Sequence, residues 1–249
     1  DYLKKVKELN QPAAAITDHG NLYGAMEFVQ KANDLGIKPI IGYEAYITPG
    51  SRFDRPDREN NKRYHLTLLA ENNIGYQNLV ELVSKAYTEG YYYKPRIDYE
   101  LLEQHHDGLI ALSGCLGGEL AQHLAPDGSV EEGNTSNERS FEKALEVAKK
   151  YQSIFGKNNY FIEIHNHGIK QQLDILDDLV EIAELIEAPL VAANDSHYVE
   201  ENGAEAHDAL LCVQTNRTLD DESRFRFDGS GYYVKSSEEM RKLFPQDKY

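Results

Sequence analysis

The sequence predicts an α/β fold in which short strands alternate with longer helices. Two observations carry this prediction. Short apolar runs alternate with amphipathic stretches about six times along the 249 residues, a pattern typical of parallel strands joined by crossover helices. Hydrophobic residues make up 41% and charged residues 27%, as in soluble globular proteins. A barrel or distorted barrel is favoured over an open sheet, and the sequence contains neither a GxGxxG fingerprint nor a Walker loop.

Each element follows from its apolar periodicity and its boundary residues. After an amphipathic helix within 1–12, we expect strands over 13–17, 38–48, 65–70, 108–114, 159–165 and 188–195. We expect further helices over 22–36, 74–87, 117–124, 136–156, 170–187 and 201–215. Two segments lack such a pattern. The charged segment 47–64 is predicted to be a mobile loop, and the tyrosine-rich segment 88–100 an irregular insertion.

The acidic composition limits the function classes. The formal net charge is −16, whereas proteins that bind nucleic acid by themselves are usually basic. Either some of the acids gather around cations or a basic neighbour holds the nucleic acid, and most acids are expected on a solvated surface. No apolar run suits a membrane span, the N-terminus does not resemble a secretory signal, and two cysteines do not make a disulfide framework. We therefore expect a cytoplasmic protein.

The ends of the predicted strands carry residues that bind metals. Because the carboxyl ends of parallel strands meet at one face, residues far apart in the sequence are expected to converge there. Zinc and manganese accept imidazole, carboxylate and thiolate ligands, and alternate residues such as Asp195 and His197 share a face. The candidates are Asp18, His19, Glu44, His65, Cys115, Glu163, His165, His167, Asp195 and His197.

Each candidate also has a purely structural interpretation. Asp18 is a possible helix cap, Cys115 a packing residue, and Asp195 with His197 a local turn. Glu44 inside an apolar strand is costly to bury without a partner, which favours a functional role. For six histidines and one cysteine the structural interpretation is preferred. His165 and His167 are expected at the surface and Cys212 in the core. The other four histidines are His105, His106, His123 and His207.

Five segments, in order, resemble the PHP (polymerase and histidinol phosphatase) domain, and more narrowly the PHP domains of bacterial DNA polymerase III alpha subunits. They are TDHGNLYGAMEF, GIKPIIGYEAYI, HLTLLAENNIGYQNL, ALSGCLGGEL and NDSHY. The resemblance implies a distorted (β/α)7 TIM-like barrel of the PHP type, with two or three Zn2+ or Mn2+ ions. The positions that match ligands are His19, Glu44, His65, Cys115, Asp195 and His197, and Asp195, Glu44 and His19 would be catalytic. Asp18, Glu163 and His167 would support them.

One motif of the family is missing from this sequence. The family's first His-x-His pair is absent, and the chain is expected to begin just past it. The implied organisation is a PHP domain over 1–215 that lacks its first strand, followed by a connection toward a polymerase region over 216–249. That region, which would use Mg2+, would lie outside this chain.

The resemblance implies a metal-dependent 3′–5′ exonuclease that proofreads for a replicative polymerase. One alternative is an inactive platform that binds a separate proofreading subunit, and another is a free-standing PHP phosphoesterase. Implied partners are DNA, a sliding clamp and other replicase subunits, without a membrane. Residues that could touch the DNA backbone are Arg52, Arg55, Arg58, Lys62 and Arg63. The tyrosine run 91–93 could stack on a base, although a core or interface role is preferred.

Overall fold

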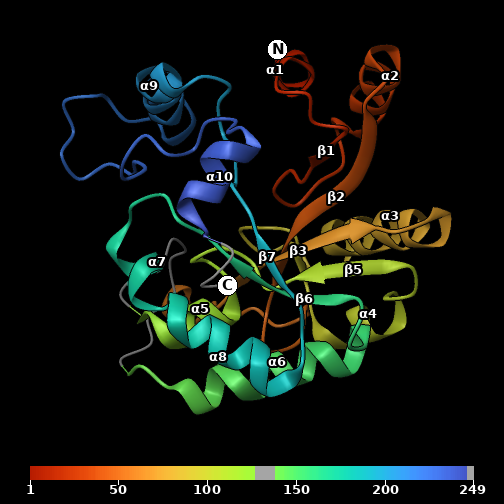
Figure 1. Cartoon of the computed structure of the whole chain (residues 1–249). Coiled ribbons are helices and arrows are strands. Elements are labelled where there is room, and N and C mark those ends of the chain that lie inside the picture. The colour runs from red at the N-terminus through yellow and green to blue at the C-terminus, as the bar shows by residue number, and fades with distance from the viewer. Residues whose placement is uncertain (127–137, 246–249) are drawn as a thin grey trace.

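The computed structural model describes residues 1–126 and 138–245 (Figure 1). The strands are β1 (Ala13–Ile16), β2 (Lys38–Ile47), β3 (Tyr64–Ala70), β4 (Arg96–Ile97), β5 (Leu109–Leu112), β6 (Tyr160–Ile164) and β7 (Leu190–Ala192). The helices are α1 (Tyr2–Glu8), α2 (Ala25–Leu35), α3 (Asn73–Thr88), α4 (Tyr99–Gln104), α5 (Glu119–Leu124), α6 (Phe141–Phe155), α7 (Lys170–Asp174), α8 (Leu176–Ile186), α9 (Ala204–Thr215) and α10 (Ser237–Leu243).

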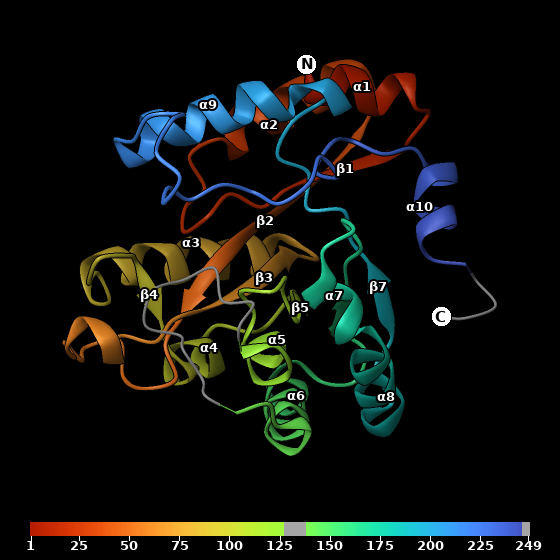
Figure 2. The ribbon, with the colours of Figure 1, turned by 90° about the vertical axis from the view of Figure 1, so that its left-hand side faces the viewer.

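One mixed sheet organises the molecule, curled into part of a distorted barrel with helices around it (Figures 1 and 2). The strand order is β1-β2-β3-β5-β6-β7, with β4 paired to β2. This confirms the predicted α/β barrel class. The expectation that all strands run parallel is wrong, because β3 is antiparallel to both β2 and β5. The link between β2 and β3 has no crossover helix, only a 3-10 turn at Arg58–Asn60, so the chain turns back beside β2.

Strand β2 belongs to both parts of the molecule. Its first residues pair in parallel with β1, while Gly42 to Ile47 pair with β3. Figure 2 shows it running from the layer of α1 and α2 into the body formed by α3 to α8. A small core surrounds its beginning and includes Val6, Phe28 and Ala32. The main core covers its end, so β2 fixes how the two parts meet.

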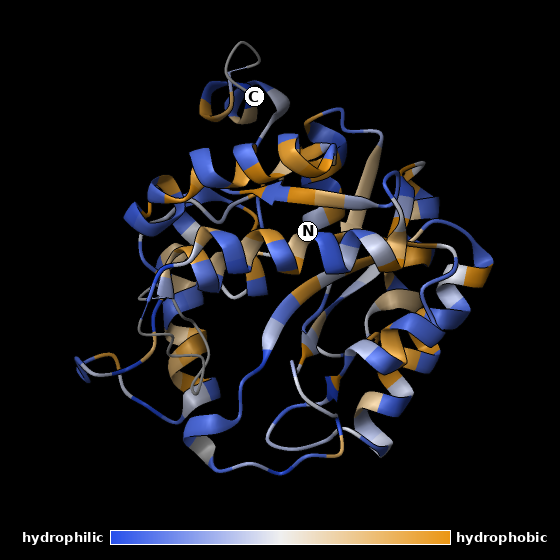
Figure 3. Ribbon diagram, turned by 90° about the horizontal axis from the view of Figure 1, so that it is seen from below, coloured by the Kyte–Doolittle hydropathy of each residue, from blue (hydrophilic) through white to orange (hydrophobic). Residues whose placement is uncertain are grey.

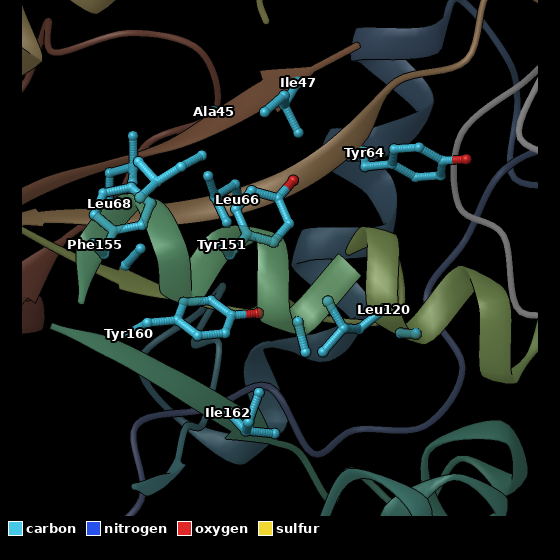
Figure 4. Packing of buried hydrophobic residues seen from close by; sticks show 14 of the residues in the cluster. Ala45, Ile47, Tyr64, Leu66, Leu68, Leu120, Tyr151, Phe155, Tyr160 and Ile162 are labelled. Carbon is cyan, nitrogen blue, oxygen red and sulfur yellow. The ribbon is translucent and has the colours of Figure 1, made fainter. Parts of the chain in front are cut away.

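The main core packs the sheet against α5, α6 and α8 (Figure 4). Leu66 and Leu68 on β3 and Ile162 on β6 are fully buried beside Tyr151 of α6. Each such aliphatic side chain contributes roughly 1.5–3 kcal/mol of burial free energy. Figure 3 shows hydrophobic stretches alternating with hydrophilic ones along the helices, and the apolar residues Ala148 of α6 and Ile182 of α8 are buried. The apolar periodicity of the sequence is therefore satisfied on the inner faces.

A buried arginine holds the two segments that were expected to be irregular. Arg96 opens the short strand β4, and its guanidinium donates to Asn61 Oδ1 at 3.0 Å, to Asp54 O at 2.7 Å and to Arg52 O at 3.1 Å. Arg52 is itself buried and pairs with Asp98 at 3.0 Å. The prediction of a mobile loop over 47–64 is thus wrong for its ends, which are anchored, and 88–100 contains the regular element β4.

Helix boundaries differ from the predictions where capping groups intervene. Helix α6 begins at Phe141, because the Ser140 hydroxyl accepts from the Lys143 backbone at 3.3 Å. The first residues of the helix predicted over 136–156 lie outside the described part. The helix predicted over 170–187 is divided at Ile175, and the one over 201–215 begins with a 3-10 turn, Glu201–Gly203.

The segment after α9 packs back onto the domain. Tyr198 and Tyr233 form a parallel bridge, and Lys235 donates to Asn194 Oδ1 at 2.9 Å. Val234 lies in the small core and Phe244 in the main one. Helix α10, which was not predicted, begins at a complete capping box made by Ser236 and Glu239. The division at residues 215 and 216 remains a prediction.

Replacing Arg96 with methionine should lower the free energy of unfolding by roughly 3 kcal/mol, because buried carbonyls lose their donors while the volume is kept. Urea unfolding at neutral pH measures the change. The matched control is Arg241→Met on the exposed face of α10, which should have little effect. A loss below about 1 kcal/mol for Arg96→Met would show that the two segments do not depend on this guanidinium.

Candidate metal centre

Three predicted ligands come together beside the C-terminal end of β1. His19 follows that strand, Glu44 lies within β2, and His65 lies in β3. The His65 Nδ1 is 2.8 Å from one Glu44 carboxylate oxygen, and the His19 Nδ1 is 3.4 Å from the other. One ligand atom from each residue lies within 4.8 Å of the others. This group can hold a metal ion.

The sheet register explains the convergence. Tyr46 of β2 pairs with His65 of β3, and Glu44 lies two residues before Tyr46, so Glu44 and His65 share one face. The opposite face of β2, with Tyr43 and Ala45, enters the main core. Since β3 is antiparallel, His65 near its beginning lies beside the end of β2. In an all-parallel sheet it would lie at the far edge.

The backbone of Asp18 links the turn after β1 to strand β2. Its carbonyl accepts from the Glu44 N–H at 3.0 Å, and the Glu44 carbonyl accepts from the Gly20 N–H at 2.9 Å. Gly20 has φ of +69°, a conformation that suits glycine. Partial burial raises the pKa of the Asp18 carboxyl. In this structure, Asp18 therefore positions His19 and Glu44 through its main chain.

Cys115 lies against the same group. Its Sγ is 3.8 Å from Glu44 Oε1 and 3.6 Å from His65 Nδ1, and it accepts from the Gly117 N–H at 3.4 Å. Burial and the Glu44 charge raise the pKa of this thiol to about 11. A bound cation would reverse that preference, because a coordinating thiol is deprotonated.

The charge of Glu44 is balanced by histidines. Burial by itself raises the pKa of this carboxyl, but His65, His19 and His197 outweigh it and lower the pKa to about 2. Glu44 is therefore an ionised carboxylate at neutral pH. A buried carboxylate with such partners is a candidate functional group.

Glu163 of strand β6 and His165, just after the strand, add a second carboxylate and a histidine that the sequence analysis treated as a surface residue. Both are buried, and His165 Nε2 is 3.1 Å from Glu163 Oε1. The other Glu163 oxygen accepts from the Gly114 N–H at 3.0 Å. Among the described residues neither ring nitrogen of His165 makes a hydrogen bond, so its contact with Glu163 is an ion pair. The alternation Glu163-x-His165, which puts both on one face of a strand, was the signal for this pair.

Asp195 and His197 lie at the rim of the group. The ring centroid of His197 is 6.5 Å from that of His19, and its Nδ1 is 2.8 Å from the Asp195 carbonyl. That contact leaves Nε2 available to a ligand. Asp195 has φ of +46°, an uncommon conformation for this residue that is often kept at functional sites. Burial and the Glu44 charge raise its pKa. The structure places both residues near the cluster, outside its tightest part.

His167 is buried, so its predicted surface position is wrong. Its Nε2 lies 2.7 Å from Asn194 O and its Nδ1 lies 2.9 Å from Gln172 Nε2. Tyr232 stacks on the ring with centroids 4.1 Å apart. Both ring nitrogens are engaged by protein groups, so His167 orients the chain behind the site.

The arginines predicted to contact DNA are mostly engaged within the protein. Arg52 is buried against Asp98 and Glu89, which removes it as a phosphate ligand on the surface. Arg63 is buried as well. Arg55 donates to the Arg52 and Glu89 carbonyls but remains exposed. For Arg55, Arg58 and Lys62 a DNA contact stays a prediction.

The other histidines assigned structural roles have protein neighbours. His105 lies 3.3 Å from Asn78 Oδ1, and His207 packs its ring edge against His197 with centroids 5.5 Å apart. Cys212 is buried in α9, in agreement with a core role. In the described part of the chain, no helix has the length and apolar character that crossing a membrane requires.

The chain matches a known domain family over most of its length. Residues 1–167 match the PHP domain, so the chain belongs to the PHP domain family. It is 48% identical over 250 residues to a DNA polymerase III subunit alpha of Thermus aquaticus. It is 46% identical to the corresponding subunits of Treponema pallidum, over 244 residues, and of Deinococcus radiodurans, over 253 residues.

These alignments cover 99%, 98% and 98% of this chain but 19%, 20% and 18% of the relatives. The chain therefore spans about a fifth of the length of these subunits. The resemblance predicted from the five segments is confirmed, both for the family and for the alpha subunits as relatives.

His167 should make the protein less stable as the pH falls. Burial lowers the pKa of this imidazole to about 4, whereas an unfolded histidine titrates near 6.5. The neutral ring therefore stabilises the fold above about pH 6.5, and this contribution is lost as the pH falls toward 4. Urea unfolding between pH 7 and 4 should show a slope steeper by up to about 1.4 kcal/mol per pH unit than in His167→Gln. Equal slopes would contradict this assignment.

Proposed function

We propose that this chain is the PHP domain of a replicative DNA polymerase alpha subunit and that its metal centre hydrolyses phosphodiesters as a 3′–5′ exonuclease. The main support is the convergence of His19, Glu44 and His65 within 4.8 Å, with Cys115 alongside. The similarity to alpha subunits over nearly the whole chain supports the assignment to a polymerase.

The donor set fits Zn2+ or Mn2+. Imidazole, carboxylate and thiol groups meet here, and both buried ring nitrogens of His165 lack a hydrogen-bond partner among the described residues. His19, Glu44, His65 and Cys115 would hold one ion. Asp195 and His197, with Glu163 and His165 behind them, would hold a second or third.

When bound, the ions supply Lewis-acid stabilisation of phosphate charge and acidify water. The side chains supply position and charge. Glu44 remains ionised and brings negative charge into a buried place. Asp195 is the more basic carboxylate and suits a proton acceptor at the rim. A Glu163 oxygen lies 3.1 Å from His165 Nε2, and the Gly114 N–H donates to the other oxygen of Glu163. No side chain has to act as a nucleophile.

The longer polymerase would supply most of the DNA-binding surface, because this chain carries a net charge of −16. Its polymerase region would use Mg2+. A sliding clamp and a proofreading subunit are further proposed partners. If the site were inactive, the same domain would serve as a rigid platform for that subunit, which makes hydrolysis the property to test.

Asp195→Asn should reduce exonuclease activity on single-stranded DNA by about 100-fold or more, since it removes a charge at the metal centre. Elemental analysis of the purified protein should find zinc or manganese, and dialysis against a chelator should abolish hydrolysis until metal is restored. Asp174→Asn, an exposed carboxylate on α7, is the matched control and should retain full activity.

Two results would reject the exonuclease proposal. One is a folded protein that binds no metal. The other is nuclease activity that persists unchanged in Asp195→Asn and therefore comes from a contaminant. In either case, retained binding of a proofreading subunit would support the platform function instead.

A further inference from the structure

An exposed group of aromatic rings lies next to the metal centre. Tyr23, Tyr87 and Tyr91, which we call the tyrosine patch, expose 80%, 38% and 54% of their surface. They come from the turn before α2, from the end of α3 and from the segment after it. Exposed aromatic side chains that gather from three parts of a chain usually mark a binding surface.

The rings of the patch are connected to one another. Tyr87 and Tyr91 stack with centroids 6.0 Å apart and an interplanar angle of 26°. The interaction with the Tyr23 side chain, together with burial, raises the pKa of Tyr87 to about 12. Tyr23 is fixed in turn, because its N–H donates to Asn21 Oδ1 at 3.0 Å. The stacked pair of Tyr87 and Tyr91 is therefore pre-organised, while the Tyr23 ring remains exposed to solvent.

The patch leads toward the ligands. Tyr23 lies four residues after His19, and Tyr46, which acts electrostatically on Tyr87, stacks on the His19 ring with centroids 6.0 Å apart. Lys94 lies over the Tyr46 ring at 5.1 Å. Among the described residues, no carboxylate forms an ion pair with Lys94. A cation is thus available where the aromatic rings meet the metal centre.

We propose that the tyrosine patch is a stacking subsite for the bases of single-stranded DNA, with Lys94 beside the backbone phosphate that enters the metal centre. Bases stack on aromatic rings without regard to sequence. Such a contact suits an acidic chain, because stacking supplies affinity that phosphate contacts cannot supply at a net charge of −16. The position of the reacting phosphodiester in this proposal rests on the proposed function.

The test measures fluorescence anisotropy of labelled oligothymidylate of about eight nucleotides in the Asp195→Asn protein, which prevents cleavage. An abasic oligonucleotide of the same length keeps the phosphates and removes the bases. The double change Tyr23→Leu and Tyr91→Leu should weaken oligothymidylate binding about tenfold and leave abasic binding unchanged.

Two controls separate stacking from a structural role. Tyr23→Phe with Tyr91→Phe keeps both rings and should retain binding of oligothymidylate. Ile74→Ala removes an exposed apolar side chain near the other end of α3 and should have no effect. The proposal is overturned if the protein with an intact patch binds oligothymidylate and the abasic oligonucleotide with equal affinity. It is also overturned if the leucine variant binds oligothymidylate as tightly as the protein with an intact patch.

Further outcomes distinguish this proposal from the exonuclease. Hydrolysis of a small chromogenic phosphodiester, measured with Asp195 intact, should be the same in the leucine variant and the parent. Base-dependent binding without any hydrolysis would reject the exonuclease and retain the subsite. Hydrolysis together with binding that does not depend on the bases would retain the exonuclease and reject the subsite. If the leucine variant loses a protein partner and keeps its DNA affinity, the patch is a protein interface and the proposal fails.

Discussion

The architecture depends on the compensation of one buried negative charge. Glu44 lies within a strand whose other face enters the main core, and an unpaired carboxylate there would be very costly. Two imidazoles, from the loop after β1 and from β3, lie within 3.4 Å of it. The same contacts that satisfy this charge also assemble the group of side chains that could hold a metal ion. Charge compensation and the geometry of the candidate site therefore have one physical origin.

Strand β2, which carries Glu44, connects this site to the rest of the fold. It pairs with β1 at its beginning and with β3 and β4 at its end, so both cores are built against it. Arg96 beside its end holds the long polar segment through main-chain carbonyls, and Asp18 holds the turn with His19 in the same way. Main-chain contacts thus fix the irregular segments around the site, while side chains remain available for chemistry.

The segment after α9 has a similar supporting role. Tyr232 stacks on His167 and touches the edge of the His197 ring, whose centroid is 5.6 Å away. Phe227 lies against His197 from another side, with centroids 4.6 Å apart. Residues that the sequence analysis assigned to a connection therefore form one wall beside the candidate site. An aromatic wall limits the conformations of His197 without competing for its nitrogen atoms.

The sequence by itself determined most of the elements, because apolar periodicity is a local property, and it offered ten candidate metal-binding residues at the strand ends. His19, Glu44 and His65 could be chosen since their residue types are costly or reactive where they occur. Tertiary structure alone decided the rest. The direction of β3 depends on a loop without a crossover helix, the burial of His165 depends on packing across the sheet, and Arg52 is occupied by acids far along the chain. Each of these depends on long-range pairing, which local sequence patterns do not encode.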